Sequence, residues 1–135
     1  MINAISVIIG TVVSIVIGMI WYSPSVFGKQ WMKELKMKES EVKKSDTGKT
    51  YFLMTVMSVV QTFVLAIVLE QFRITGALYG ALIGVLLWAG FIATTNFSSV
   101  LFEKRSSMTY TIFSVYQLVA MIAIGASIVL SNRFF

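Results

Sequence analysis

Four long apolar runs, separated by short polar stretches, dominate the pattern of hydrophobic and polar positions along the chain. They cover residues 2–22, 51–69, 76–102 and 109–130, and none of them contains a charged residue. About 20 apolar residues in an α-helix cross the hydrocarbon core of a bilayer. The pattern therefore predicts an all-α fold, an integral membrane four-transmembrane-helix bundle that forms one domain over residues 1–135. The third run is longer than a span needs, which predicts a tilted or frayed helix.

A short amphipathic segment follows the first run. Pro24 has no backbone N–H and disfavours helix in the residue before it, so the first span should end near Ser23. Ser23 is then expected to cap a short interfacial helix with Pro24 at its first position. The apolar face of this helix would contain Val26, Phe27, Trp31 and Leu35. Tryptophan and tyrosine anchor such segments at headgroup level. The predicted interface motif comprises Trp21, Tyr22, Ser23, Pro24, Phe27, Gly28, Lys29 and Trp31.

The positions of the basic residues predict the orientation in the membrane. Lysines crowd the loop over residues 25–50, at positions 29, 33, 36, 38, 43, 44 and 49, and the loop after the third run adds Lys104 and Arg105. The opposite face has only Arg73 and Arg133. Cytoplasmic loops carry the excess of lysine and arginine, so both of these loops are expected in the cytoplasm. The prediction is a multi-pass protein of the cell (inner) membrane with both termini outside.

Composition narrows the chemistry that the chain can perform. The sequence is 57% hydrophobic and 13% charged, and it contains no cysteine and no histidine. Disulfides, thiol nucleophiles and imidazole bases are therefore absent, and we predict no metal site and no cofactor. Most of the basic residues behind the net charge of +5 lie in a loop in which acidic residues are interleaved with lysines, which disfavours nucleic acid as a partner. Membrane lipids are the expected surroundings, and anionic lipids are a second interpretation of the basic loop.

Small residues recur at helical spacing inside the runs. Ser6, Gly10, Ser14 and Gly18 form a four-residue repeat in the first run. Gly76, Gly80 and Gly84 form a double GxxxG in the third. The second and fourth runs contain weaker equivalents. Such stripes let helices approach closely. They predict tight packing within a compact bundle that has no wide pore, and a homo-oligomer face is the alternative.

Uncharged polar residues within the runs are the candidate site. The predicted polar intramembrane cluster comprises Gln61, Thr94, Thr95, Asn96 and Gln117. Counted from the lysine-rich loops, these positions lie roughly 12 to 15 Å deep, so they can meet. We predict that Gln117 contacts a polar group on the second or third span, because an unpaired amide in hydrocarbon is costly. The cluster either fixes helix register or binds a polar molecule or ion.

The charged residues provide weaker evidence for a functional site than the polar cluster does. Lys29 and Glu103 both fall at the cytoplasmic ends of spans, which suggests an ion pair, although such interfacial pairs contribute little. None of the six carboxylates and none of the basic residues lies inside a run, so proton-coupled transport through an intramembrane charge is disfavoured. Without a histidine base, a G-x-S-x-G elbow or a phosphate-binding glycine loop, we expect no enzyme.

Three separated motifs resemble a known family. They are Trp21-Tyr22-Ser23-Pro24 with Phe27-Gly28-Lys29 and Trp31-Met32, then Leu101 to Arg105, then Tyr116-Gln117-Leu118. In order and spacing they are similar to the membrane-protein family catalogued as domain of unknown function 1761. The resemblance covers essentially the whole chain and implies four transmembrane helices in a small prokaryotic-type protein, with no activity or cofactor attached. Ser106 and Ser107 stand where the family often has a proline, which implies a looser turn.

The sequence thus favours a non-enzymatic membrane protein that acts through helix, partner or lipid contacts, as a homo-oligomer or with a membrane partner protein. The alternatives are a small oligomeric channel or transporter, or a hydrophobic-ligand binder, with the polar cluster in the inner half of the bundle. A transporter should have a polar cavity that reaches the cluster. An interaction module should have a dry core, and a ligand binder should have a lateral cleft lined by aromatic residues.

Overall fold

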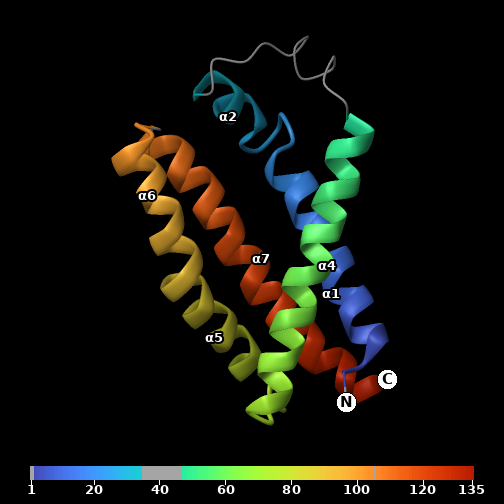
Figure 1. The fold of residues 1–135 in the computed structure, drawn as a ribbon. Coiled ribbons are helices and arrows are strands. Elements are labelled where there is room, and N and C mark those ends of the chain that lie inside the picture. Colours follow the sequence, from blue (N-terminus) through green and yellow to red (C-terminus); the bar gives the residue numbers. More distant parts are fainter. Residues whose placement is uncertain (1, 35–46, 105) are drawn as a thin grey trace.

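The computed structural model describes residues 2–34, 47–104 and 106–135, and everything described is helix or short connection (Figure 1). The helices are α1 (Ala4–Trp21), α2 (Gly28–Glu34), α4 (Thr47–Gln71), α5 (Ala77–Leu87), the π-helical segment η1 (Trp88–Ala93), α6 (Thr94–Phe102) and α7 (Ser107–Phe134). Much of the lysine-rich loop, including Leu35 of the predicted apolar face, lies outside the described residues.

Four helices are long and apolar enough to cross a membrane, as predicted. They are Ala4–Trp21, Gly48–Gln71, Ala77–Phe102 and Ser107–Phe134. The helix of the second span begins before the predicted residue 51, and the fourth extends beyond the predicted residues 109 and 130 at both ends. Side-chain caps contribute to two of these helix starts. Asn3 Oδ1 accepts from the backbone N–H of Ile5, and Ser106 Oγ accepts from that of Thr109.

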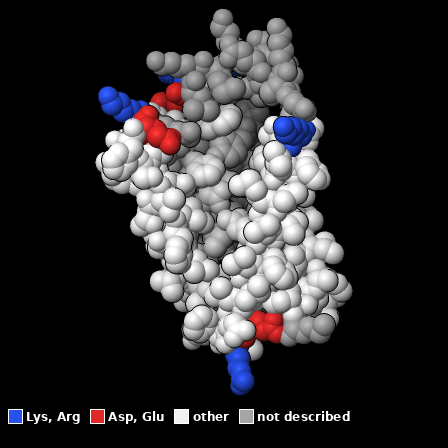
Figure 2. Space-filling model, viewed as in Figure 1, with Lys and Arg blue, Asp and Glu red and all other residues white. Residues whose placement is uncertain are grey.

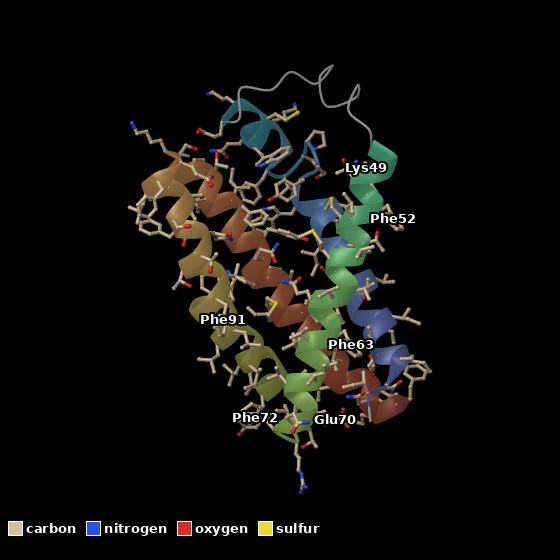
Figure 3. The ribbon with its side chains drawn as sticks, viewed as in Figure 1. Lys49, Phe52, Phe63, Glu70, Phe72 and Phe91 are labelled. Atoms are coloured by element: carbon tan, nitrogen blue, oxygen red, sulfur yellow. The ribbon has the colours of Figure 1, made fainter. Side chains whose placement is uncertain are left out.

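Charged side chains gather at the two ends of the bundle and leave an uncharged belt between them (Figure 2). We call the end that carries α2 and Lys49 the lysine-rich end, and the end where both termini lie the termini end (Figures 1 and 3). Phe52, Phe63 and Phe91 project from the belt (Figure 3), and their side chains are 44 to 70% exposed. Large exposed apolar side chains in such a belt are what a lipid-facing surface requires.

The central helix of the bundle is α7. It packs along α1 on one side and α5 on the other, while α4 packs mainly on α1 and reaches α7 over a shorter length. The core cluster consists largely of α7 residues, among them Ala120, Ile124 and Ile128, with Leu65 and Leu69 of α4. Because the core lies along α7, the fold depends on how closely the other helices approach this one.

Glycines allow the helices to approach one another closely, as the sequence predicts for Gly10, Gly80 and Gly84. A Cβ at Gly80 would lie 2.5 Å from the Gly125 carbonyl oxygen, and one at Gly84 would collide with the backbone of Met121. A Cβ at Gly10 would lie 2.6 Å from Thr62 Cγ2, and one at Gly18 would lie 3.0 Å from Tyr116 Oη. The small-residue stripes are thus consumed by packing within one chain.

One prediction about glycine needs correction, and one packing glycine was not predicted. Gly76 is the residue before α5 rather than part of its packing face, and a Cβ there would meet only its neighbour Tyr79. Gly125 of α7 was missed, although it faces Gly80 backbone to backbone. In a span already rich in small residues, a single glycine does not reveal which face meets the partner helix.

The interfacial helix also differs from its prediction. Helix α2 begins at Gly28, not at Pro24, because the preceding residues form a tight turn. The Phe27 N–H donates to the Trp21 carbonyl and the Gly28 N–H to the Ser23 carbonyl. The Ser23 hydroxyl bonds the Ile20 carbonyl at the end of α1. Since that hydroxyl closes α1, it does not cap the next helix.

Candidate functional site

An amide pair joins α4 to α7 near the middle of the bundle. Gln61 Nε2 donates to Gln117 Oε1 over 3.2 Å, and both side chains are half-buried. Interhelical bonds of this kind contribute about 0.6 to 2 kcal/mol in a membrane. The structure therefore contains the contact predicted for Gln117, and the bond holds α4 in register against α7.

The exposure of the side chains along α4 and α7 changes at this amide pair. Towards the termini end, Leu65, Ala120 and Ile124 are at most 1% exposed. Towards the lysine-rich end, Met57 is 70% exposed and Phe113 is 39% exposed. On α4 the amide pair thus lies at the boundary between a part with a buried inner face and a part that is exposed on all faces. We call the corresponding halves of the bundle the closed half, or termini half, at the termini end, and the open half, or lysine-rich half, at the lysine-rich end, although Ile112 and Tyr116 of α7 stay buried in the open half.

In the lysine-rich half, α4 diverges from α7, whereas α6 stays in contact with it (Figure 1). Residues 48–57 of α4 are exposed on every face, and most of α6 is exposed as well. Among the described residues, α4 packs mainly on α1 and α6 packs on α7, so α4 and α6 have different partners at this end. Figure 2 shows the surface receding between α6 and α4 in this half. The opening is lateral, towards the lipid that would surround the belt.

The five residues of the predicted polar cluster are not all brought together. Thr94 is exposed, and its hydroxyl donates to the Gly90 carbonyl of its own helix over 2.8 Å. Thr95 and Asn96 line a separate groove between α6 and α7. The predicted cluster therefore divides into the amide pair on α4 and α7, and a second polar group on α6.

The π-helical segment before α6 was not foreseen. The Trp88 indole N–H at its start donates to the Ser114 carbonyl of α7 over 2.8 Å. Beyond it, a Cβ at Gly90 would meet nothing within 4 Å. A π-helical turn shifts the faces of the residues that follow, so positions counted on an ideal α-helix face elsewhere. Because this span is apolar on all sides, its sequence pattern does not reveal a π-helical turn.

The groove between α6 and α7 is lined mostly by residues with polar side chains and has a volume of about 370 Å³. Its lining comprises Thr95, Asn96, Ser98, Ser99, Glu103, Thr109, Tyr110 and Phe113. Several of these groups are already bonded: the Ser98 and Ser99 hydroxyls donate to carbonyls of α6, and Tyr110 Oη donates to the Ala93 carbonyl over 3.0 Å. Asn96 Nδ2 is buried and has no hydrogen-bond partner among the described residues. A buried donor of this kind needs an acceptor.

The interface motif forms an aromatic cluster over the lysine-rich end of α1. The rings of Trp21 and Phe27 lie 4.6 Å apart, and those of Tyr22 and Trp31 lie 5.1 Å apart. The Tyr22 ring also contacts Tyr116 of α7 at 5.5 Å. Edge-on contacts of this geometry add to the gain from burial alone. The motif thus fastens the turn before α2 onto α7.

Two further features hold this cluster in place. The Trp21 indole N–H donates to the Ile112 carbonyl over 3.0 Å. A Cβ at Gly28 would collide with the carbonyls of Tyr22 and Ser23, so only glycine fits there. Burial, with the neighbouring Tyr116 as a second cause, raises the pKa of Tyr22. The Tyr22 hydroxyl therefore stays protonated and neutral at the membrane surface.

Lys29 and Glu103, predicted as an ion pair, are both exposed at the lysine-rich end. In the described part of the chain, no ion pair joins the two. Lys29 belongs to α2, whereas Glu103 ends α6 and lines the groove beside α7. An exposed ammonium gains little from such a pair because water solvates it well.

The described part of the belt presents amides, hydroxyls and exposed aromatic rings rather than charged side chains. Among the described residues, no three carboxylates gather as a metal site would require. The polar groups of the belt are amides and hydroxyls, which donate and accept hydrogen bonds but are poor acids and bases. A molecule with polar and apolar parts fits this combination of amides, hydroxyls and exposed rings.

The fold defines the class: a small all-helical protein in which four of the described helices are long and apolar enough to cross a membrane. The family profile described as "Protein of unknown function (DUF1761)" matches residues 5–129. The chain belongs to this family, as the resemblance of its three motifs indicated. No curated protein and no solved structure matches it.

Proposed function

We propose that this protein is a non-enzymatic binding protein of the cell membrane, and that it accommodates a lipid-like molecule in the open half between α4 and α6. In this proposal the lysine-rich end faces the cytoplasm and both termini lie outside, following the charge bias of the loops. The ligand enters sideways from the inner leaflet. Nucleic acid plays no part.

The change in burial at the amide pair is the observation that supports this proposal. A helix pair meant only for packing would be buried along its whole length, yet residues 48–57 of α4 are all exposed. Meanwhile the small-residue stripes are used up by contacts within the chain. The surface that no other helix of the chain covers is therefore a lateral cleft in one half of the membrane. This shape is expected for a hydrophobic-ligand site.

Photocrosslinking tests this function directly. A phospholipid with a diazirine midway along one acyl chain is incorporated into nanodiscs with the protein, and crosslinked peptides are mapped by mass spectrometry. We expect adducts on the face of α7 that carries Phe113 and Gln117, in addition to general labelling of the lipid-facing belt. Absence of adducts from that face would refute the proposal.

A matched pair of variants separates the cleft from the general surface. Gln117→Trp fills the cleft and should abolish the α7 adducts, whereas Leu130→Trp adds the same ring at a residue of α7 that is 42% exposed. Labelling of the outer face of α4, at Phe63, should be the same in both variants. If the two variants label alike on α7, the cleft is not the binding site.

The same geometry also fits a second function, that of a carrier in a conformation open to one side of the membrane. The core around Leu65 and Ile124 is buried, and α4 is exposed towards the lysine-rich end, as in an inward-facing carrier. A groove of about 320 Å³ between α1, α4 and α7 opens at the termini end. Because the sequence has no cysteine, single cysteines report access cleanly. A carrier predicts that a cysteine at Ala123 becomes reactive from the termini side when ligand is added. A static binding protein predicts no such change.

A further inference from the structure

We infer that the groove between α6 and α7 binds the headgroup region of a phosphoglyceride with a primary ammonium group, of the phosphatidylethanolamine type. The acyl chain of the same molecule would lie in the open half beside Phe113. This inference rests on the proposed function, because it names the class of lipid that the open half accommodates. The groove residues that carry it are Asn96, Ser99, Glu103, Tyr110 and Phe113.

The unpartnered amide of Asn96 calls for an acceptor. Its Nδ2 is buried, and the neighbouring groups have other partners: the Ser99 hydroxyl donates to the Asn96 carbonyl over 2.7 Å, and Tyr110 Oη donates to the Ala93 carbonyl. A hydrocarbon chain offers no acceptor, but the ester carbonyls of a phosphoglyceride do. An ester oxygen in the groove would satisfy the one buried donor that its walls leave unbonded.

The order of groups along α6 matches the order of groups in the lipid. Asn96, Ser99 and Glu103 follow one another at spacings of three and four residues, so they share one face of the helix. Asn96 and Glu103 are separated by roughly 10 Å along the helix axis, from a rise of about 1.5 Å per residue. In a phosphoglyceride the ester carbonyls lie deeper than the phosphate, and the ammonium lies outermost. An ester at Asn96 thus places the headgroup near Glu103.

Charge at the mouth of the groove selects the headgroup. Glu103 is a carboxylate at this end of the belt, and the exposed Lys104 follows it at once. A carboxylate accepts hydrogen bonds from a primary ammonium and repels a headgroup that carries only negative charge. Lys104 suits the phosphate of the same headgroup. A zwitterionic lipid with a primary amine offers a donor to the Glu103 carboxylate and a phosphate to Lys104, whereas a choline headgroup has no N–H to donate.

Deeper in the groove the surface turns apolar. Phe113 lines the groove and is also the exposed residue of α7 one turn from Gln117. Phe113 is therefore shared by the groove and the open half, where the proposed acyl chain would lie. One molecule spans both regions, with its polar end between α6 and α7 and its chain ending near the amide pair.

Lipid competition tests the inference. The protein is placed in nanodiscs that contain equal parts of phosphatidylethanolamine, phosphatidylcholine and phosphatidylglycerol, and the lipids retained on release are identified by native mass spectrometry. We expect the wild type to retain the ethanolamine lipid preferentially. Glu103→Gln should lower that preference about three-fold, the size of an exposed charge interaction. Asn96→Leu should lower lipid retention about five-fold, the size of a lost hydrogen bond.

Two controls keep the outcomes separate. Glu70→Gln removes a carboxylate at the termini end, and Thr94→Val removes a hydroxyl bonded to its own helix, so neither should change the preference. Thermal unfolding checks that the variants fold, and Glu103 is exposed, so its variant tests the inference even where Asn96→Leu destabilises the bundle. Equal retention of the three headgroups, or an unchanged preference in Glu103→Gln, would overturn the inference while leaving the proposed function standing. Retention of no lipid at all would overturn both.

Discussion

The two halves of this bundle are built from the same kinds of residue yet are packed differently. In the termini half, α5 and α7 meet backbone to backbone at Gly80 and Gly125, and Leu65 of α4 is 1% exposed. In the lysine-rich half, Leu53 of the same helix is 48% exposed. Both halves are apolar, so hydrophobicity does not distinguish them. What distinguishes them is where small residues permit backbones to touch, because lipid competes equally well for every larger apolar side chain.

The largest expected effect comes from a matched pair of leucines on α4. Leu65→Ala should lower the free energy of unfolding by about 3 kcal/mol because it leaves a cavity in the closed half. Leu53→Ala should change it by less than about 0.5 kcal/mol because lipid already contacts that side chain. Unfolding in mixed micelles with increasing dodecyl sulfate measures both. Equal losses would mean that the two halves are packed alike.

A pair of glycines sharpens the same comparison. Gly80→Ala should cost about 2 kcal/mol, since its Cβ would press on the carbonyl of Gly125 and push α5 away from α7. Gly90→Ala, in the same continuous span, meets open space and should be close to neutral. The measurement is the same unfolding titration. A neutral Gly80→Ala would show that α5 and α7 do not approach as closely as described.

The amide pair at the boundary should contribute less. A double-mutant cycle with Gln61→Leu and Gln117→Leu is expected to give a coupling energy of about 1 kcal/mol for the interhelical hydrogen bond. Each single variant leaves one amide unpaired, so the double variant should be no less stable than either single one. A coupling energy of zero would contradict the bond.

The smallest expected effect concerns the aromatic cluster at the lysine-rich end. Trp21→Phe keeps an aromatic ring beside Phe27 but removes the indole N–H that bonds the Ile112 carbonyl. The expected loss is about 0.5 kcal/mol, since the ring contacts persist and one modest hydrogen bond is lost. Trp31→Phe removes an indole for which no hydrogen bond is described, so its loss should be smaller still. Intact thermal transitions for both variants check that the fold survives.

The sequence was sufficient for the architecture, because each span is a continuous apolar run whose length alone indicates a crossing. It also predicted that Gln117 would find a polar partner, since an amide in hydrocarbon has few alternatives. Ser23 and Pro24 misled the prediction of α2. Local capping preferences do not include the competing Ile20 carbonyl, which takes the Ser23 hydroxyl.

The open half was beyond sequence reasoning. Whether α4 and α6 converge or diverge depends on the angles at which they cross α7, and residues 48–57 look equally apolar in either case. The π-helical segment at residues 88–93 was hidden for a related reason, because a helix that is apolar on all sides has no polar face to reveal a shift in register. Asn96 was identified as polar and intramembrane, but its separation from the Gln61–Gln117 pair follows from that segment.

The central claim is that the face of α7 carrying Phe113 is open to lipid, and quenching by brominated lipid tests it most directly. The three native tryptophans are replaced by phenylalanine, and single tryptophans are placed at Phe113, at Tyr116, which is 7% exposed, and at Phe91, which is 70% exposed. The account predicts quenching at residue 113 nearly as strong as at residue 91 and much stronger than at residue 116. Quenching at residue 113 as weak as at residue 116 would contradict it.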